Sequence, residues 1–217
     1  MKILIVAPHA DDEVLGCGGT IKKRASKGDE IRVCFVTQAY EPEWTAAYIK
    51  NKEKEITRAC FVLGVAEKYF LGFPAAKLDS IPKKDLNFKI KEIIKNFVPK
   101  AIYIPHRDDL HFDHRLVYEA CLVATRPIGK CSVEEIYTYE TLSETEWGMG
   151  SFRANVFEDI SDTLKYKIKA MKAYKSELMT YPHPRSLRAI KALAEKRASE
   201  SGFKFAESFE LLKCYRK

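Results

Sequence analysis

The sequence predicts an α/β protein of three layers with a mainly parallel sheet and a helical C-terminal segment. Short apolar runs alternate with longer amphipathic segments through the first two thirds of the chain, and this alternation is typical of βαβ units. From residue 161 onward the pattern is mostly helical and basic. There are no internal repeats and no obvious linkers, so we expect residues 1–217 to form a single domain with a Rossmann-like arrangement.

The predicted strands are runs rich in apolar and β-branched residues that end at polar or glycine-containing segments. They are Lys2–Ala7, Glu30–Thr37, Lys68–Leu71, Ala101–Pro105, Glu135–Glu140 and Asn155–Asp159. The predicted helices show apolar residues at helical spacing, and Gly64 and Pro99 close two of them. They are Val14–Ser26, Glu43–Leu63, Leu86–Phe97, Phe112–Thr125, Ser161–Leu178 and Ser186–Ser201. A short apolar tail, Phe209–Leu212, ends the chain.

Composition narrows the class of protein. An apolar fraction of 46% and a charged fraction of 31% are ordinary for a soluble globular chain. The net charge of +7 is compatible with anionic substrates but too small to indicate nucleic-acid binding. No apolar run approaches the ~20 residues that span a bilayer, so we expect no membrane partner.

The cysteines indicate a reducing compartment. None of the six forms a C-x-x-C pair, and no signal peptide is visible before the first strand. They are Cys17, Cys34, Cys60, Cys121, Cys131 and Cys214. We therefore expect reduced, mostly buried thiols and a cytoplasmic location.

Two polar clusters follow two of the predicted strands. Ala7–Glu13 (APHADDE) comes after the first strand, and His106–His114 (HRDDLHFDH) comes after the strand Ala101–Pro105. In open α/β sheets, ligands bind beyond the carboxyl ends of the strands, at the point where the strand order reverses. The two clusters are therefore expected to meet in one crevice.

The combined clusters have the composition of a catalytic metal site. Such sites commonly use three His or carboxylate ligands and leave one position for water. His9, Asp12 and His114 would supply this set, and Asp11 would be free to act as a general base on the activated water. Two histidines and a carboxylate suit Zn²⁺, and the same set also suits Fe²⁺.

His111 lies one helical turn before His114 and can project to the same side. As a charged imidazole it could stabilise an oxyanion or protonate a leaving amine, with Asp113 holding it in orientation. Each of these residues taken alone also suits a helix cap or a solvated polar position. Four of the five histidines fall in the two clusters, however, and this joint pattern favours a site.

The glycines after the first cluster do not indicate a dinucleotide site. Gly16, Gly18 and Gly19 fail to complete G-x-G-x-x-G, because Ile21 stands at the third glycine position. Carboxylates also occupy the place where a pyrophosphate would bind. Close packing of the first helix on the sheet explains these glycines instead.

With both clusters in view, the sequence resembles the PIG-L (LmbE-like) family of zinc-dependent N-deacetylases. The family's (A/P)-H-P-D-D-E motif is matched by Pro8–Glu13, and its H-x-D-H motif by His111–His114. Weaker similarities continue to Phe209, so the resemblance spans nearly the whole chain. Ala10 replaces the usual proline of the first motif, which removes no ligand.

The resemblance implies a zinc-dependent hydrolase that removes an N-acetyl group from an N-acetylglucosamine-type conjugate. By matching positions, the metal ligands are His9, Asp12 and His114, the general base is Asp11, and the electrostatic catalyst is His111 with its partner Asp113. A small amino-sugar conjugate would be the partner, and self-association is compatible with the resemblance because relatives often assemble.

Three basic residues are candidates for substrate contacts. Lys52 lies near a position where many family members carry arginine, and Arg185 and Arg197 lie in a C-terminal region that resembles the branch acting on sugar intermediates of low-molecular-weight thiol synthesis. Inside the crevice, either arginine would suit an anionic substrate group. A solvated basic face explains them equally well.

Two alternative functions remain open from the sequence. A metal-dependent hydrolase of another bond, such as a phosphoester or a different amide, would more naturally show additional bridging carboxylates for a second metal. A catalytically silent metal-binding member of the family would have no need of a spare base, yet Asp11 and His111 are both present.

Overall fold

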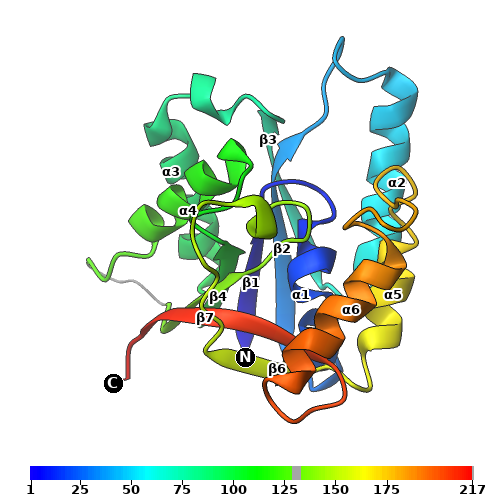
Figure 1. The fold of residues 1–217 in the computed structure, drawn as a ribbon. Helices are drawn as coiled ribbons and strands as arrows, with labels where there is room; N and C mark the ends of the chain where they lie inside the picture. The colour runs from blue at the N-terminus through cyan, green and yellow to red at the C-terminus, as the bar shows by residue number, and fades with distance from the viewer. Residues whose placement is uncertain (129–132, 217) are drawn as a thin grey trace.

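The structure is a computed structural model that describes residues 1–128 and 133–216. Its centre is a seven-stranded sheet with the order β3-β2-β1-β4-β5-β7-β6 (Figure 1). The strands are β1 (Lys2–Ala7), β2 (Glu30–Gln38), β3 (Glu67–Pro74), β4 (Ala101–Pro105), β5 (Glu135–Tyr139), β6 (Val156–Asp159) and β7 (Ala206–Cys214). The first five are parallel, while β7 runs antiparallel to β5 and β6. The predicted Rossmann-like, mainly parallel fold is confirmed.

Helices cover both faces of the sheet (Figure 1). They are α1 (Asp12–Ser26), α2 (Ala46–Leu63), α3 (Lys83–Phe97), α4 (Phe112–Ala124), α5 (Leu164–Met171) and α6 (Leu187–Ser199), with short 3₁₀ helices at Leu78–Ser80 and Thr145–Trp147. One apolar core joins the sheet to α1, α2, α5 and α6, and a second joins it to α3 and α4. The three-layer arrangement follows from these two cores.

Strand β1 lies at the centre of both cores. Ile3 and Ile5 belong to the core on the α1 side, whereas Leu4 and Val6 belong to the core on the α3 side. This alternation explains why the strand is a continuous apolar run, since both of its faces are buried. Because β1 pairs with β2 on one side and β4 on the other, its carboxyl end is the predicted switch point.

Glycine allows the close approach of α1 to the sheet. A Cβ atom at Gly16 would lie 2.3 Å from Cδ2 of Tyr139 on β5, which is closer than side-chain carbons can approach. The interpretation of this glycine as a packing residue is therefore confirmed. Gly64 adopts φ of 82° and caps the end of α2, as its position in the sequence predicts.

The predictions for the C-terminal third need two corrections. The predicted helix Ser161–Leu178 is reduced to α5, Leu164–Met171. The chain leaves the helix because Tyr174 turns into the core and donates a hydrogen bond of 2.6 Å to the Glu13 carboxylate. The apolar tail Phe209–Leu212 is part of strand β7, which pairs with β5 and β6.

The five cysteines in the described part of the chain are free. Four of them are buried and Cys214 is exposed, while Cys131 lies outside the described residues. Among residues 1–128 and 133–216, no helix combines the length and the apolar character needed to cross a membrane.

Candidate active site

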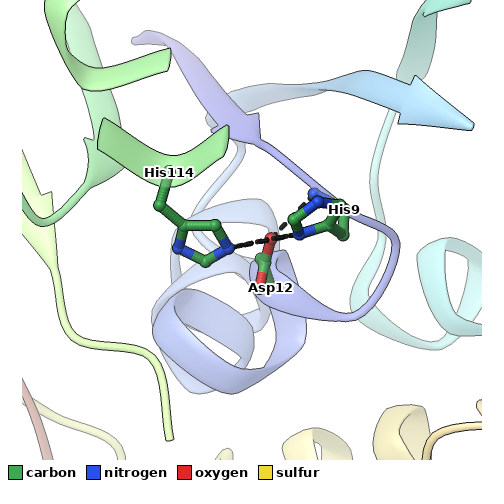
Figure 2. Close-up of side chains that lie close together, drawn as sticks. All are labelled: His9, Asp12 and His114. Carbon is green, nitrogen blue, oxygen red and sulfur yellow. Dashed lines mark hydrogen bonds and ion pairs between the residues drawn. The ribbon is translucent and has the colours of Figure 1, made fainter. Parts of the chain in front are cut away.

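Three predicted ligand side chains converge beyond the carboxyl end of β1. His9 comes from the loop after β1, Asp12 from the first turn of α1, and His114 from the first turn of α4 (Figure 2). His9 Nδ1 lies 3.2 Å from His114 Nε2, and Asp12 Oδ2 lies 3.6 Å from the first nitrogen and 3.3 Å from the second. The two clusters therefore meet at one point.

The triangle formed by these atoms fits a tetrahedral metal ion. Zinc binds nitrogen and carboxylate oxygen at about 2.0–2.2 Å, so two ligands of a tetrahedral ion lie about 3.3–3.5 Å apart. The three separations scatter around that value. Two imidazole nitrogens and one carboxylate oxygen are also a donor set suited to Zn²⁺ or Fe²⁺, so the residues fit a divalent cation.

Each histidine of the triangle has a carboxylate at its other ring nitrogen. Asp109 Oδ2 lies 2.8 Å from Nδ1 of His114, and Asp113 Oδ2 lies 3.0 Å from Nε2 of His9. Asp109 is itself fixed by a hydrogen bond of 2.6 Å from the Thr145 hydroxyl. Such partners hold a metal-binding imidazole in one tautomer and one orientation.

The local electrostatics favour positive charge between the ligands. Burial opposes ionisation of Asp12, but His114 and His9 together hold the pKa of its carboxyl well below the usual range. Burial likewise opposes the charged form of His114, yet Asp12 and Asp109 raise the pKa of this imidazole to about 10. The acids thus stabilise a cation here, and a metal ion competes with the proton for the same nitrogen.

Asp11 stands apart from the triangle. It precedes α1, its carboxylate is 4% exposed, and its Oδ2 has no hydrogen-bond partner in the described structure. Burial raises its pKa well above the usual value; the carboxylate of Asp12 adds to this rise, and the guanidinium of Arg185 opposes it. A buried carboxylate with a raised pKa and an oxygen free of hydrogen bonds can accept a proton at neutral pH.

Asp113 contacts both His9 and His111, through different groups. The Asp113 carboxylate contacts His9 and accepts the backbone N–H groups of Ala76 and Leu78, while only its backbone N–H reaches His111, at Nδ1. His111 therefore acts as the N-cap of α4. Burial, followed by the nearby His9 and His114, lowers the pKa of His111 to about 4 and outweighs the opposing effect of the Asp113 and Asp12 carboxylates, so the imidazole is neutral at pH 7.

A second set of donors overlaps the first. His9, His111 and Asp113 also lie within 4.8 Å of one another. This set depends on His9 again, and it shares no carboxylate with the first, so it lacks the bridging acid of a two-metal site. In the set of His9, Asp12 and His114, each histidine has a carboxylate at its other ring nitrogen. We therefore take this set as the candidate metal centre.

A cavity of about 670 Å³ opens beside the candidate metal centre. His9, Asp11, Asp12, His111 and His114 all line it. This volume is within the range of ligand-binding cavities and exceeds what a single acetyl group needs.

Two of the three predicted substrate contacts line the same cavity. Lys52 forms an ion pair with Glu177, and Arg185 donates a 2.8 Å hydrogen bond to the same carboxylate and lies 3.7 Å from Asp11 Oδ2. Arg197 does not line the cavity. It forms a two-pronged ion pair with Glu140, with bonds of 2.7 and 2.6 Å.

Several residues near the site are not evident from the sequence. From the sequence alone, the position of Asp109 suits a helix cap as well as a site residue. Glu144 and Glu177 lie in loops without a recognisable motif. Glu144 Oε2 accepts the backbone N–H of His111 at 3.1 Å. The acid two residues before the H-x-D-H motif is the one available signal in the sequence, and only the fold reveals the other two.

A comparison with protein families identifies the chain. Residues 4–125 match the family described as PIG-L: GlcNAc-PI de-N-acetylase. The chain belongs to the PIG-L family. The match covers more than half of the sequence and includes both strand-end clusters.

Curated relatives of this PIG-L protein are named as deacetylases. It is 31% identical over 180 residues to the uncharacterized deacetylase YaiS of Escherichia coli (strain K12), covering 80% of this chain and 90% of that protein. It is 26% identical over 190 residues to the probable N-acetyl-alpha-D-glucosaminyl L-malate deacetylase 2 of Bacillus cereus, covering 81% and 83%.

Solved structures share the fold. The conserved protein TT1542 of Thermus thermophilus superposes with a TM-score of 0.81 at 24% identity, over 99% of this chain and 96% of that one. The 4-carboxy-2-hydroxymuconate hydratase GalB of Pseudomonas putida KT2440 superposes with a TM-score of 0.78 at 18% identity, over 100% and 98%. Since a hydratase has this fold as well, the reaction must be argued from the site.

Proposed function

We propose that this PIG-L protein is a metal-dependent N-deacetylase that hydrolyses the acetamide of an N-acetylglucosamine-type conjugate. The observation that carries the proposal is the triangle of His9 Nδ1, Asp12 Oδ2 and His114 Nε2 at one cavity, beside the buried Asp11 carboxylate, whose Oδ2 accepts no hydrogen bond. The relatives named as deacetylases of N-acetylglucosaminyl malate and of diacetylchitobiose support the substrate class.

In this proposal His9, Asp12 and His114 hold Zn²⁺, with Fe²⁺ as the second candidate. When bound, the cation acts as a Lewis acid that activates water and polarises the acetyl carbonyl. Asp11 accepts the proton of the attacking water, and its raised pKa makes it a stronger base than an ordinary aspartate. After the C–N bond breaks, the amine leaves with a proton and the acetyl group leaves as acetate.

His111 stabilises the negative charge that develops on the acetyl oxygen. Its Nδ1 accepts the backbone N–H of Asp113 at 3.1 Å, so in the neutral ring the proton resides on Nε2. A neutral N–H donor fixed at the wall of the cavity serves as one member of an oxyanion hole. Asp113 acts through His9, which it orients, rather than through His111.

Lys52 and Arg185 take part in substrate binding through the Glu177 carboxylate that they share. Arg197 lies outside the cavity lining and is left out of the proposal. We also propose that residues 1–217 form one deacetylase domain, because strand β7 from the C-terminal end completes the sheet that β1 begins.

Acetate release tests the proposal. The purified protein, after chelation and reloading with Zn²⁺ or Fe²⁺, is incubated with N-acetylglucosamine and several of its glycosides, and acetate and free amine are measured. We expect both products in equal amounts, no activity after chelation, and recovery on reloading. Release of phosphate from phosphoesters together with inert acetamides would contradict the assignment of the bond.

A further inference from the structure

We propose that the part of the cavity lined by Trp44, Tyr48 and Phe70 binds the aglycone of the substrate. The aglycone that fits there is uncharged and has a flat apolar face, such as a second sugar ring or an aryl group, rather than a dicarboxylate. This inference rests on the proposed N-deacetylase function and specifies its substrate class. It stands on a row of aromatic side chains and on the charges of the cavity wall.

A chain of contacts leads from the general base to this part of the cavity. Arg185 Nη1 lies 3.7 Å from Asp11 and donates a hydrogen bond of 2.8 Å to Glu177. The Tyr48 hydroxyl donates a 2.8 Å hydrogen bond to the same carboxylate, and the Tyr48 ring stacks on Trp44 with centroids 6.4 Å apart. The aromatic rings therefore begin where the polar end of the cavity stops.

The aromatic rings form a prepared surface. Trp44 and Tyr48 both line the cavity, and Tyr40 packs edge-on against Trp44 with centroids 5.5 Å apart. Phe70 also lines the cavity from β3; its ring is 52% exposed and stacks on Phe35. Partly exposed rings that pack against other rings offer apolar faces to a ligand at low entropic cost.

Trp44 and Tyr48 come from a segment that extends away from the sheet. The loop after β2 and the first turns of α2 rise beyond the carboxyl ends of the strands (Figure 1). An amino sugar with its acetamide at His9 and His114 would therefore direct its aglycone toward Trp44. The cavity of about 670 Å³ has room for both parts.

The charges of the wall do not favour an anionic aglycone. Carboxylates outnumber lysine and arginine side chains among the lining residues, which are Asp11, Asp12, Glu53, Glu144 and Glu177 against Lys52, Lys68 and Arg185. With neutral histidines, a bound divalent cation would bring this wall only to neutrality. Since two of the basic groups already pair with Glu177, they are not free to bind a ligand anion.

Lys68 is the remaining basic group of the wall. No ion pair within residues 1–128 and 133–216 involves it, and it lies two residues from Phe70 on β3. Glu53 lines the same cavity and carries the opposite charge. One lysine offset by one glutamate does not match the two carboxylates of a malate, whereas the adjacent rings match a flat apolar group.

Fluorescence gives a direct test, because the chain has two tryptophans, Trp44 in the cavity wall and Trp147 outside it. In the metal-loaded Trp147→Phe protein, Trp44 is the sole tryptophan. An added Asp11→Asn substitution prevents turnover during titration. We expect benzyl N-acetylglucosaminide to change the Trp44 emission saturably and to bind about tenfold more tightly than N-acetylglucosaminyl malate.

Calorimetry on matched variants separates a binding role from a structural one. Trp44→Ala should weaken the benzyl glycoside about tenfold and leave N-acetylglucosamine unchanged, and Phe70→Ala should act in the same direction. The control Trp147→Ala removes an indole that is 62% exposed and outside the cavity, and it should change neither affinity.

Each other outcome overturns the inference. Tighter binding of the malate conjugate than of the benzyl glycoside, or binding of the malate conjugate that depends on Lys68, would show that the subsite takes an anionic aglycone. Equal weakening of both ligands by Trp44→Ala would show that Trp44 has a structural role. If the benzyl glycoside does not bind, the subsite does not exist. The proposed deacetylation has a separate test in the protein that retains Asp11. If that protein binds the benzyl glycoside selectively but releases no acetate from it, deacetylation is refuted and the subsite stays in place.

Discussion

Asp11 combines three features that rarely occur together in a side chain with only a structural role. Its φ of 129° is a left-handed value that residues with a Cβ atom seldom adopt. Its backbone is nevertheless held firmly, since its carbonyl accepts the N–H groups of Val14 and Leu15 and its own N–H donates to Glu13. Oδ2 of its carboxylate is buried and accepts no hydrogen bond, although Arg185 lies 3.7 Å away. A strained backbone and a buried oxygen without a hydrogen bond at one residue are typical of functional sites.

The two adjacent aspartates should therefore separate metal binding from catalysis. Asp11→Asn should lower the rate of acetate release by about 10²–10⁴-fold, because a positioned general base contributes that factor. Its metal content should stay at one ion per chain, measured by elemental analysis. The matched variant Asp12→Asn should lose both metal and activity. Loss of metal from the Asp11 variant would contradict the assignment of the two roles.

Asp109 illustrates how an orienting residue acts through a ligand. It is 1% exposed and holds Nδ1 of His114, while its neighbour Asp108 is a partly exposed residue that pairs with Arg107. Asp109→Asn should weaken metal affinity about 10–100-fold, as is usual for the loss of a carboxylate behind a metal-binding imidazole. Competition with a chelator measures this change, and Asp108→Asn serves as the control. Equal effects of the two substitutions would show that Asp109 has no special role.

At the scale of elements, a buried ion pair joins the C-terminal elements to α1. Lys167 of α5 contacts Glu207 of β7 at 2.7 Å, and both are almost fully buried. Lys167 Nζ also donates to the carbonyl of Leu15, and Glu207 accepts the N–H of Gly19. In a regular α-helix that carbonyl and that N–H bond to each other. The ion pair thus engages the backbone of the helix that begins at the active site.

Removing one member of this pair should be strongly destabilising. Lys167→Met should lower the free energy of unfolding by about 3–5 kcal/mol, because it leaves the Glu207 carboxylate buried and uncompensated. Urea unfolding followed by circular dichroism measures the change. Lys165→Met on the exposed side of the same helix should cost less than about 0.5 kcal/mol. If Lys167→Met with Glu207→Gln is no more stable than the single variant, the uncompensated charge is not the cause.

The sequence predicts the bounds of a strand well where both faces of the strand are buried. The bounds of β1 and β4 agree with their apolar runs, because every residue in such a run faces a core. The end of α5 and the strand β7 depend instead on distant partners: Tyr174 reaches Glu13, and β7 pairs with β5. A periodic pattern does not contain this information, since the same residues also suit a continuing helix.

The same distinction applies to the site. His9, Asp12 and His114 are brought together as the two motifs predict, because both motifs sit directly at strand ends. The carboxylate behind His9 is less evident from the sequence, since Asp113 reaches His9 across 104 positions. Glu177, which links Lys52 to Arg185, lies in a loop whose path only the tertiary fold determines.

At the scale of the whole molecule, the candidate metal centre ties both halves of the parallel sheet together. Its donors come from the loop after β1 and from α4 after β4, and the acids behind them reach the loop after β3 and the turn at Thr145. These segments meet beyond the carboxyl ends of the strands, where the ligand side chains are polar. A cation would therefore stabilise the folded chain as well as supply reactivity.

Metal removal should thus lower thermal stability in a way that depends on metal concentration. A ligand at about 1,000 times its Kd adds about 4 kcal/mol, which for a domain of about this size corresponds to a rise in Tm of roughly 10 °C. Differential scanning calorimetry of the chelated protein, titrated with Zn²⁺, measures this. His114→Ala should show no such rise, because it lacks one ligand of the candidate centre. A Tm that rises equally in both proteins would mean that zinc binds elsewhere, and a Tm that rises in neither would mean that the triangle of donors holds no zinc.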